Sequence, residues 1–102
     1  MKVTIGQVNA RHSIMVWQLL EIEAHACKLD VVVVQEPPVQ VQRDTSKWRE
    51  YNILYPRGSS PLVALAMRST LKFEPVWVGG TRVCGALLKY SGFSILILSA
   101  YL

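Results

Sequence analysis

The sequence lacks the features of a membrane protein or of a disulfide-stabilised protein. No apolar run approaches the ~20 residues that a transmembrane helix requires. The first residues alternate apolar with polar side chains, unlike the continuous apolar core of a secretory signal. Cys27 and Cys84 show no CxxC spacing and lie in apolar segments, so we expect buried free thiols rather than a disulfide or a reactive thiol. These absences predict an intracellular location and no membrane partner.

Charged residues are also scarce. They make up 18% of the 102 residues and leave a net charge of +4, whereas 51% of the residues are hydrophobic, which is typical of one folded domain. The basic residues gather only in one polar stretch, which contains Arg43, Lys47, Arg49 and Arg57 and the aromatic residues Trp48, Tyr51 and Tyr55. Such a stretch can follow a phosphate backbone while its rings, above all Trp48, stack on bases. The alternative is a solvated loop with Trp48 packed beneath it.

Several catalytic and metal-binding motifs are missing. Gly80 and Gly85 have the spacing of a phosphate-binding loop, but the required Lys and Ser or Thr do not follow them. His12 and His25 have no carboxylate or cysteine at ligand spacing, so the sequence predicts no zinc site. No serine lies in a G-x-S-x-G elbow.

The first third of the chain has the pattern of a strand–helix–strand unit. A short strand that contains Val3, Ile5 and Val8 ends near Asn9. Residues 13–29 then follow a helical period, with Ser13 as the N-cap. The apolar stripe that we expect to pack on the sheet is Met15, Leu19, Ile22, Ala26 and Leu29. Residues 31–35 are apolar on both faces, which predicts a central buried strand parallel to the first.

The remainder predicts an antiparallel arrangement. Residues 40–61 are assigned to a long loop, because they are polar or contain turn residues. Four strands follow, and the last three are separated at hairpin distance: 62–67, 73–78, 82–89 and 93–101. The expected fold class is α/β, with one βαβ unit followed by an antiparallel meander.

Two polar side chains follow neighbouring strands of this predicted sheet. Asn9 ends the first strand and Glu36 follows the second, and open α/β sheets bind ligands at the carboxyl ends of parallel strands. Pro37 is expected to hold Glu36 extended. A carboxylate beside an amide suits Mg²⁺, which keeps several waters and substrate phosphate oxygens as its other ligands. The alternative is that Glu36 is a solvated strand end.

Three segments carry a family resemblance. Ile5–Asn9, Leu29–Pro37 and Ile95–Tyr101 resemble the N-terminal half of an endonuclease/exonuclease/phosphatase domain, with the closest similarity to the apurinic-type endonucleases of non-LTR retrotransposons. The resemblance implies a two-sheet α/β sandwich and a metal-dependent hydrolase of DNA. It also implies Mg²⁺ or Mn²⁺ as the cofactor, bound by Glu36 and Asn9.

The resemblance assigns roles to individual residues as well. Asn9, Glu36 and Tyr101 match positions that act in catalysis in the family. Arg11 stands where related repair enzymes often carry an acidic residue, and we expect it to contact nucleic acid together with the basic stretch. A nuclear location would follow if the retrotransposon resemblance holds.

The sequence departs from the family in one further respect. The G-D-F-N segment and the late Asp-His pair of the family's second half, which supply the general base, have no counterpart here. Residues 1–102 are therefore expected to form one partial domain that ends after the Ser99–Tyr101 segment and is inactive by itself. Its expected partners are DNA and either the missing C-terminal half or a second copy. The alternative is an inactive remnant that binds nucleic acid or another protein.

Overall fold

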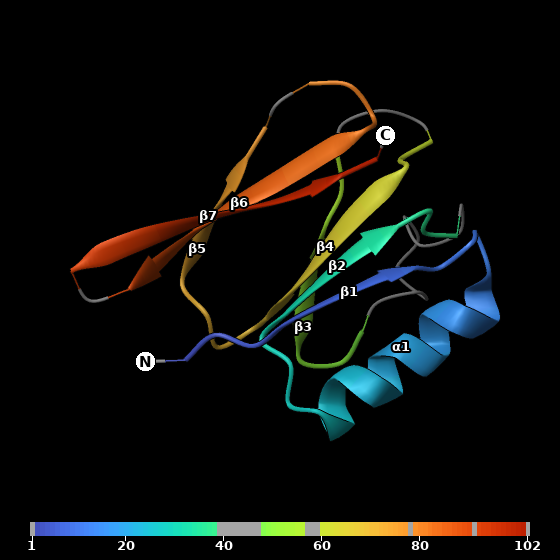
Figure 1. The fold of residues 1–102 in the computed structure, drawn as a ribbon, viewed down its shortest axis with the longest axis horizontal. Helices are drawn as coiled ribbons and strands as arrows, with labels where there is room; N and C mark the ends of the chain where they lie inside the picture. The colour runs from blue at the N-terminus through green and yellow to red at the C-terminus, as the bar shows by residue number, and fades with distance from the viewer. Residues whose placement is uncertain (1, 39–47, 57–59, 78, 91, 102) are drawn as a thin grey trace.

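The computed structural model describes residues 2–38, 48–56, 60–77, 79–90 and 92–101 (Figure 1). They form one helix and two sheets. The elements, in chain order, are β1 (Ile5–Asn9), α1 (Ile14–Ala26), β2 (Val31–Gln35), β3 (Tyr51–Leu54), β4 (Val63–Arg68), β5 (Phe73–Val76), β6 (Val83–Tyr90) and β7 (Phe93–Ala100).

The first sheet contains the expected βαβ unit. Its strand order is β1-β2-β4-β3, and β1 pairs with β2 in parallel through α1. Strand β2 is buried along its whole apolar run, because α1 covers one face of this sheet and the second sheet covers the other. The predicted central strand is therefore confirmed.

The second sheet is the antiparallel meander β5-β6-β7. It packs face to face on the first sheet, and the core between the two sheets is apolar. The members of this core with 0% exposure are Val31, Val63, Leu65, Met67, Ala86 and Leu88. The fold class is thus the predicted α/β sandwich, with strands of both layers in this chain.

Two strands differ from the prediction. Tyr51–Leu54, assigned to a loop, forms β3 and pairs antiparallel with β4. The strand predicted over residues 62–67 is β4, but it joins the first sheet between β2 and β3 and is not part of the meander. Strand pairing depends on partners distant in sequence, so the local turn residues around β3 did not reveal it.

Helix α1 begins after the predicted N-cap, and the Ser13 hydroxyl accepts a hydrogen bond from the Val16 N–H at 3.2 Å. The helix ends at Ala26, three residues earlier than expected. The predicted packing stripe is wrong for four of its five residues. Met15, Leu19 and Ile22 are 55% to 69% exposed and Ala26 is exposed as well, whereas the helix packs through Trp17 and Ala24. Only Leu29 of the stripe packs against the core. The centroids of the Trp17 and Trp48 rings lie 4.7 Å apart, so α1 buries the face that carries its largest side chain.

The two cysteines lie in different environments. Cys84 is buried in the core between the sheets, and burial raises the pKa of its thiol to about 12. Cys27 forms the C-cap of α1 and is exposed, which corrects the prediction that both are core residues. Both thiols are free, as expected.

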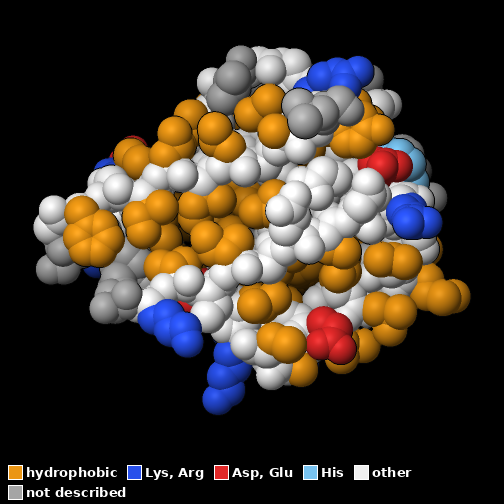
Figure 2. Space-filling model, in the orientation of Figure 1, with side chains coloured by type: hydrophobic (Ala, Val, Ile, Leu, Met, Phe, Trp, Pro, Cys, Tyr) orange, Lys and Arg blue, Asp and Glu red, His pale blue; other side chains and the backbone are white. Residues whose placement is uncertain are grey.

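Apolar side chains remain uncovered on two outer surfaces, which Figure 2 shows in orange. One is the outer side of α1. The other is the outer face and end of β7, where Phe93, Leu96 and Leu98 are each about half exposed. Ile95 and Ile97 of the same strand pack against the first sheet instead. In the part of the chain that the structure describes, no helix is long and apolar enough to cross a membrane.

Candidate functional site

The carboxyl ends of β1 and β2 bring two predicted site residues into contact. Asn9 is paired with Gln35 in the parallel register, so the residue after β2 lies next to Asn9. The Asn9 amide Nδ2 donates a hydrogen bond to Glu36 Oε2 at 2.6 Å. Asn9 Oδ1 accepts a hydrogen bond from the Arg11 N–H at 2.8 Å. The amide is thus held between the β1–α1 turn and the carboxylate.

The backbone around this pair is bent into the left-handed region. Glu36 has a φ of 50°, which corrects the expectation that Pro37 holds it extended. Arg11 and His12 have φ values of 52° and 58°, which are uncommon for residues other than glycine. The turn is fixed by hydrogen bonds: the Glu36 carbonyl accepts from the His12 N–H at 2.7 Å, and the Glu36 N–H donates to the Leu62 carbonyl at 2.8 Å. These bonds outweigh the local preference of the residue before a proline.

A third side chain, His12, lies at the same place. Its Nε2 is 3.3 Å from Glu36 Oε1, and its Nδ1 is 3.1 Å from the Pro37 carbonyl oxygen. Sequence reasoning missed this contact because it searched for carboxylates at ligand spacing along the chain, and Glu36 is near His12 only in the folded structure. The left-handed backbone of His12, directly before the N-cap of α1, has no recognisable signature in the sequence.

Tyr101 lies at the same end of the molecule. The arrowheads of β1, β2 and β7 point to one side in Figure 1, and the Ser99 hydroxyl donates to the Val34 carbonyl at 3.3 Å. Tyr101 follows β7 directly and packs against the core between the sheets. The Arg82 guanidinium carbon lies 5.6 Å from the centre of the Tyr101 ring, so a cation that the sequence analysis did not single out is also present there.

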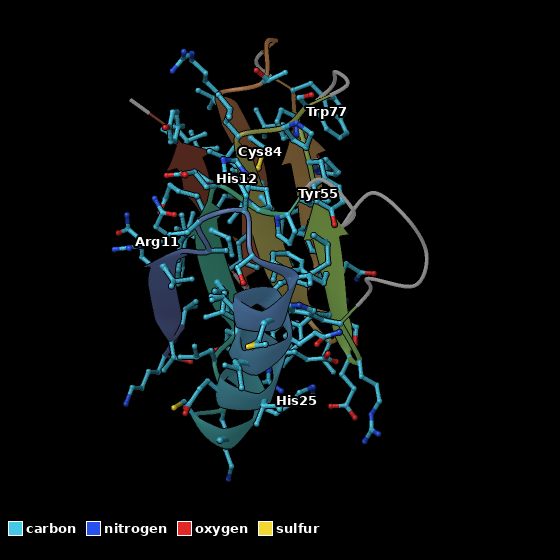
Figure 3. The ribbon with its side chains drawn as sticks, turned by 90° about the vertical axis from the view of Figure 1, so that its right-hand side faces the viewer. Arg11, His12, His25, Tyr55, Trp77 and Cys84 are labelled. Carbon is cyan, nitrogen blue, oxygen red and sulfur yellow. The ribbon has the colours of Figure 1, made fainter. Side chains whose placement is uncertain are left out.

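The predicted basic residues do not all gather at this end. Arg11 is exposed beside Asn9 and reaches outward from the molecule (Figure 3). Arg49 is exposed near the last turn of α1, where its carbonyl oxygen is 2.8 Å from His25 Nε2. The 13-residue helix is about 20 Å long, so Arg49 and the Asn9–Glu36 pair lie at opposite ends of it. Arg43, Lys47 and Arg57 lie outside the described residues.

Trp48 is placed in the core and not on the surface. It is 3% exposed, and its ring contacts Trp17 at 4.7 Å and Tyr51 at 5.7 Å between centroids. Its indole Nε1 is buried with no hydrogen-bond partner among the described residues. The structure therefore matches the alternative for Trp48 itself, a packed side chain, because the buried ring has no face open for stacking on a base.

The donor set at the Asn9–Glu36 pair is small. In the described ranges, no group of three or more His, Cys, Asp or Glu side chains gathers in a way that could hold a metal ion. Mg²⁺ needs no such group, because it binds through one or two carboxylates and retains waters and phosphate oxygens. The Glu36 carboxylate, which the Asn9 amide N–H contacts at 2.6 Å, fits weak Mg²⁺ binding of that kind.

The fold is shared with a known endonuclease domain and with a second protein. The endonuclease domain of TRAS1, a telomere-specific non-LTR retrotransposon, superposes with a TM-score of 0.85 at 17% identity, over 99% of this chain and 45% of that chain. The chain has an endonuclease/exonuclease/phosphatase-type fold. D. rerio TDP2, solved in complex with a single-stranded DNA product, superposes with a TM-score of 0.70 at 18% identity, over 94% of this chain and 44% of its own. A humanized form of that protein gives 0.69 at 19% identity, over 94% and 45%.

These similarities are structural. No family model and no curated protein matches the sequence. The chain spans less than half of the length of each of the three structures. The predicted resemblance and fold class are confirmed at this level, as one part of an endonuclease/exonuclease/phosphatase-type sandwich.

Proposed function

We propose that this chain carries the metal-binding and phosphate-binding part of a divalent-metal-dependent hydrolase of DNA phosphodiesters. The observation that supports this most is the 2.6 Å contact between Asn9 and Glu36 at the carboxyl ends of two parallel strands. Open α/β sheets place their ligands at that edge. The fold is also that of an endonuclease domain and of a protein solved with a DNA product.

The proposal gives a role to each of four residues: Glu36, Asn9, Tyr101 and Arg11. Glu36 is the carboxylate ligand of Mg²⁺ or Mn²⁺, and Asn9 orients that carboxylate through its amide N–H. Tyr101 positions the scissile phosphate, and Arg11 contacts the DNA backbone, with the basic stretch around Arg49 as a second area of contact. The metal ion, when bound, supplies positive charge that polarises a phosphoryl oxygen.

The chain is not expected to cleave DNA by itself. In the family that the sequence resembles, the general base belongs to a second half whose motifs this sequence does not contain. A base has to lie within hydrogen-bond reach of the water that it activates. In this proposal Glu36, Asn9 and Tyr101 bind the metal and the phosphate, and the general base is supplied by another segment or partner.

Metal-dependent DNA binding tests the proposal. Fluorescence anisotropy of a labelled single-stranded oligonucleotide is measured with wild type, Glu36→Gln and the control Glu74→Gln, each in Mg²⁺ and in EDTA. Glu74 suits the control because it is an exposed carboxylate on the other sheet, paired with Lys89. We expect Mg²⁺ to strengthen DNA binding several-fold in wild type and in the control, and to have no effect in Glu36→Gln.

An equal Mg²⁺ effect in wild type and Glu36→Gln would contradict the proposal, because it would remove Glu36 from the metal site. Mg²⁺-dependent nicking of supercoiled plasmid that disappears in Glu36→Gln would support the role of Glu36 and contradict only the expectation that the chain is inactive by itself. We expect nicking to stay at background in every variant.

The exposed apolar surface of β7 supports a macromolecular partner, either a further part of the domain or a second copy. β7 is an edge strand, its eight residues carry no charge, and Leu96 and Leu98 are about half exposed. Uncharged apolar edges of this kind pair with other chains. We therefore propose that the isolated chain self-associates through β7.

Sedimentation at micromolar concentration tests this association. We expect wild type to sediment as a dimer or larger species, and Leu96→Lys to shift it towards the monomer. Met15→Lys is the matched control, because it adds the same charge to an exposed apolar position on α1. If Met15→Lys dissociates the chain and Leu96→Lys does not, the helix is the interface. A monodisperse wild-type monomer would contradict self-association altogether.

The same surfaces favour one alternative function. An inactive remnant that acts as a protein-interaction module would use the exposed stripe of α1, which consists of Met15, Leu19 and Ile22. Loss of metal-dependent DNA binding in wild type, together with association through α1, would favour this alternative.

A further inference from the structure

An exposed cation lies beside Tyr101, on the side of the second sheet. Arg82 directly precedes β6, and its carbonyl oxygen accepts a hydrogen bond from the Tyr101 N–H at 2.8 Å. The Arg82 guanidinium carbon lies 5.6 Å from the centre of the Tyr101 ring, and the residue is exposed. Arg82 therefore presents a positive charge to solvent next to a residue that the family resemblance places at the active site.

Backbone hydrogen bonds connect this position to Glu36. The Glu36 N–H donates to the Leu62 carbonyl at 2.8 Å, and the Leu62 N–H donates to the Thr81 carbonyl at 2.9 Å. Segments joined by one such hydrogen bond lie about 5 Å apart, so the two bonds separate Glu36 from the residue before Arg82 by about 10 Å. Glu36 and Arg82 therefore lie at the same end of the sandwich, close enough to contact one bound strand of nucleic acid.

Arg68 shows how the same kind of contact serves a structural role in this protein. Its guanidinium carbon lies 5.4 Å from the centre of the Tyr51 ring, much as Arg82 lies beside its own tyrosine. Arg68 Nη2 also donates to the Leu29 carbonyl at 2.7 Å, and its Nε lies 3.5 Å from Asp30 Oδ1. Among the described residues, no carboxylate or carbonyl oxygen satisfies the Arg82 guanidinium in this way.

A guanidinium restrained by a ring, with its donors available, suits a phosphate oxyanion. The ring restrains the cation without supplying an acceptor oxygen, so the N–H groups remain available to a ligand. A guanidinium presents these donors as a planar fork that binds two oxygens of one phosphate. Arg11 is the corresponding exposed cation after β1, and its N–H donates to Asn9, which in turn contacts Glu36. Glu36 therefore lies between Arg11 and Arg82 along one row of hydrogen bonds.

We propose that Arg82 binds a phosphate of the DNA backbone, and that the bound strand crosses the end of the sandwich from Arg11 on the first sheet to Arg82 on the second. This inference rests on the proposed function, since it extends the same site to the second sheet. Tyr101 is then also a positioning residue for Arg82, because its ring holds the guanidinium. Phosphate contacts orient a strand without reading its bases, so the contribution of Arg82 does not depend on base sequence.

DNA binding in EDTA, measured at several NaCl concentrations, tests Arg82 without any contribution from a metal ion. Fluorescence anisotropy of a labelled single-stranded oligonucleotide is recorded for wild type, Arg82→Gln and the control Lys72→Gln. Lys72 is exposed, and its carbonyl oxygen accepts from the Lys89 N–H at the other end of β6, about 23 Å from Arg82. We expect Arg82→Gln to weaken binding about tenfold, and Lys72→Gln to change it less than twofold. The slope of log affinity against log salt concentration should become shallower by about 0.7 in Arg82→Gln, as the loss of one phosphate contact on a single strand requires.

Arg82→Lys separates the loss of a phosphate contact from a loss of folding. We expect it to restore the wild-type salt slope and only part of the affinity, because an ammonium group keeps the charge but lacks the planar fork. Equal affinities and slopes in Arg82→Gln and Lys72→Gln would overturn the proposal. If that result occurs while Mg²⁺ still strengthens DNA binding through Glu36, the proposed function stands and the role of Arg82 is wrong. If Arg82→Gln behaves as expected but Mg²⁺ has no effect in wild type, the role of Arg82 stands and the metal part of the proposed function fails.

Discussion

Asp30 lies directly before the first residue of β2 and Glu36 directly after its last, and the groups that surround these two carboxylates differ. Asp30 and Glu36 are equally exposed, at 22% and 23% of the side chain. Both oxygens of Asp30 face donors: Oδ2 accepts from the Thr4 N–H at 3.0 Å, and Oδ1 lies 3.5 Å from Arg68 Nε. Burial therefore does not distinguish the two carboxylates, but their partners do.

The two carboxylates differ in the groups that contact their oxygen atoms. The Thr4 hydroxyl lies 3.1 Å from Asp30 Oδ2, and Arg68 Nη2 donates to the Leu29 carbonyl at 2.7 Å, so the partners of Asp30 are themselves anchored. Among the described residues, Glu36 is contacted by the Asn9 amide N–H at 2.6 Å and by His12 Nε2 at 3.3 Å. The Asp30 end is a network of anchored donors, whereas these two partners of Glu36 are exposed side chains.

We expect the largest effect when each of the two carboxylates is replaced by its isosteric amide. In Asp30→Asn an NH₂ group faces a donor in either orientation, so we expect the free energy of unfolding to fall by about 2 kcal/mol. In Glu36→Gln the oxygen still accepts from Asn9 and the new NH₂ donates to His12 Nε2, so we expect stability within about 0.5 kcal/mol of wild type. Urea unfolding followed by tryptophan fluorescence measures both. Equal losses would show that the Glu36 end is structural as well.

We expect a somewhat smaller effect on stability when a divalent metal ion is added. A divalent ion present at ten times its dissociation constant stabilises the folded state by about 1.4 kcal/mol. We expect Mg²⁺ or Mn²⁺ at that level to raise the thermal midpoint of wild type and to leave that of Glu36→Gln unchanged. The Asp30→Asn variant should keep the full metal-induced increase from its lower starting point. A metal-induced increase that is lost in Asp30→Asn and kept in Glu36→Gln would show that the ion binds at Asp30 and not at Glu36.

The smallest effect concerns alkaline pH at the Asp30 end. Burial of Tyr51 raises its pKa above 10.0, the nearby Arg68 lowers it in part, and Asp30 and Glu50 raise it further. Above pH 10 the unfolded chain has lost this proton while the folded chain keeps it, so the stability from Tyr51 is present at neutral pH and declines as pH rises.

The Tyr51→Phe variant isolates this contribution. The Tyr51 hydroxyl donates to the Leu29 carbonyl at 2.5 Å, so its removal should cost about 1 kcal/mol at pH 8. We expect the difference between variant and wild type to shrink by pH 10.5, measured by urea unfolding at both pH values. A difference that grows with pH would mean that the pKa of Tyr51 is lowered by folding.

The sequence by itself determined the βαβ unit and the meeting of Asn9 with Glu36. Helical and strand periods are local, and parallel strands necessarily bring their carboxyl ends to one edge of a sheet. The resemblance carried by the strands around Glu36 and Tyr101 also led to the fold that the structural comparisons confirm. The roles of these residues in binding metal and phosphate stay predictions.

Only the tertiary structure decided the rest. The face that α1 buries depends on Trp48, which a distant segment supplies against Trp17, so the period of the helix alone selected the wrong side. The pairing of His12 with Glu36 depends on left-handed backbone angles at both residues, and hydrogen bonds between the two turns hold those angles. Contacts between segments far apart in sequence, not local preferences, stabilise these features, which is the physical reason that the sequence pattern did not contain them.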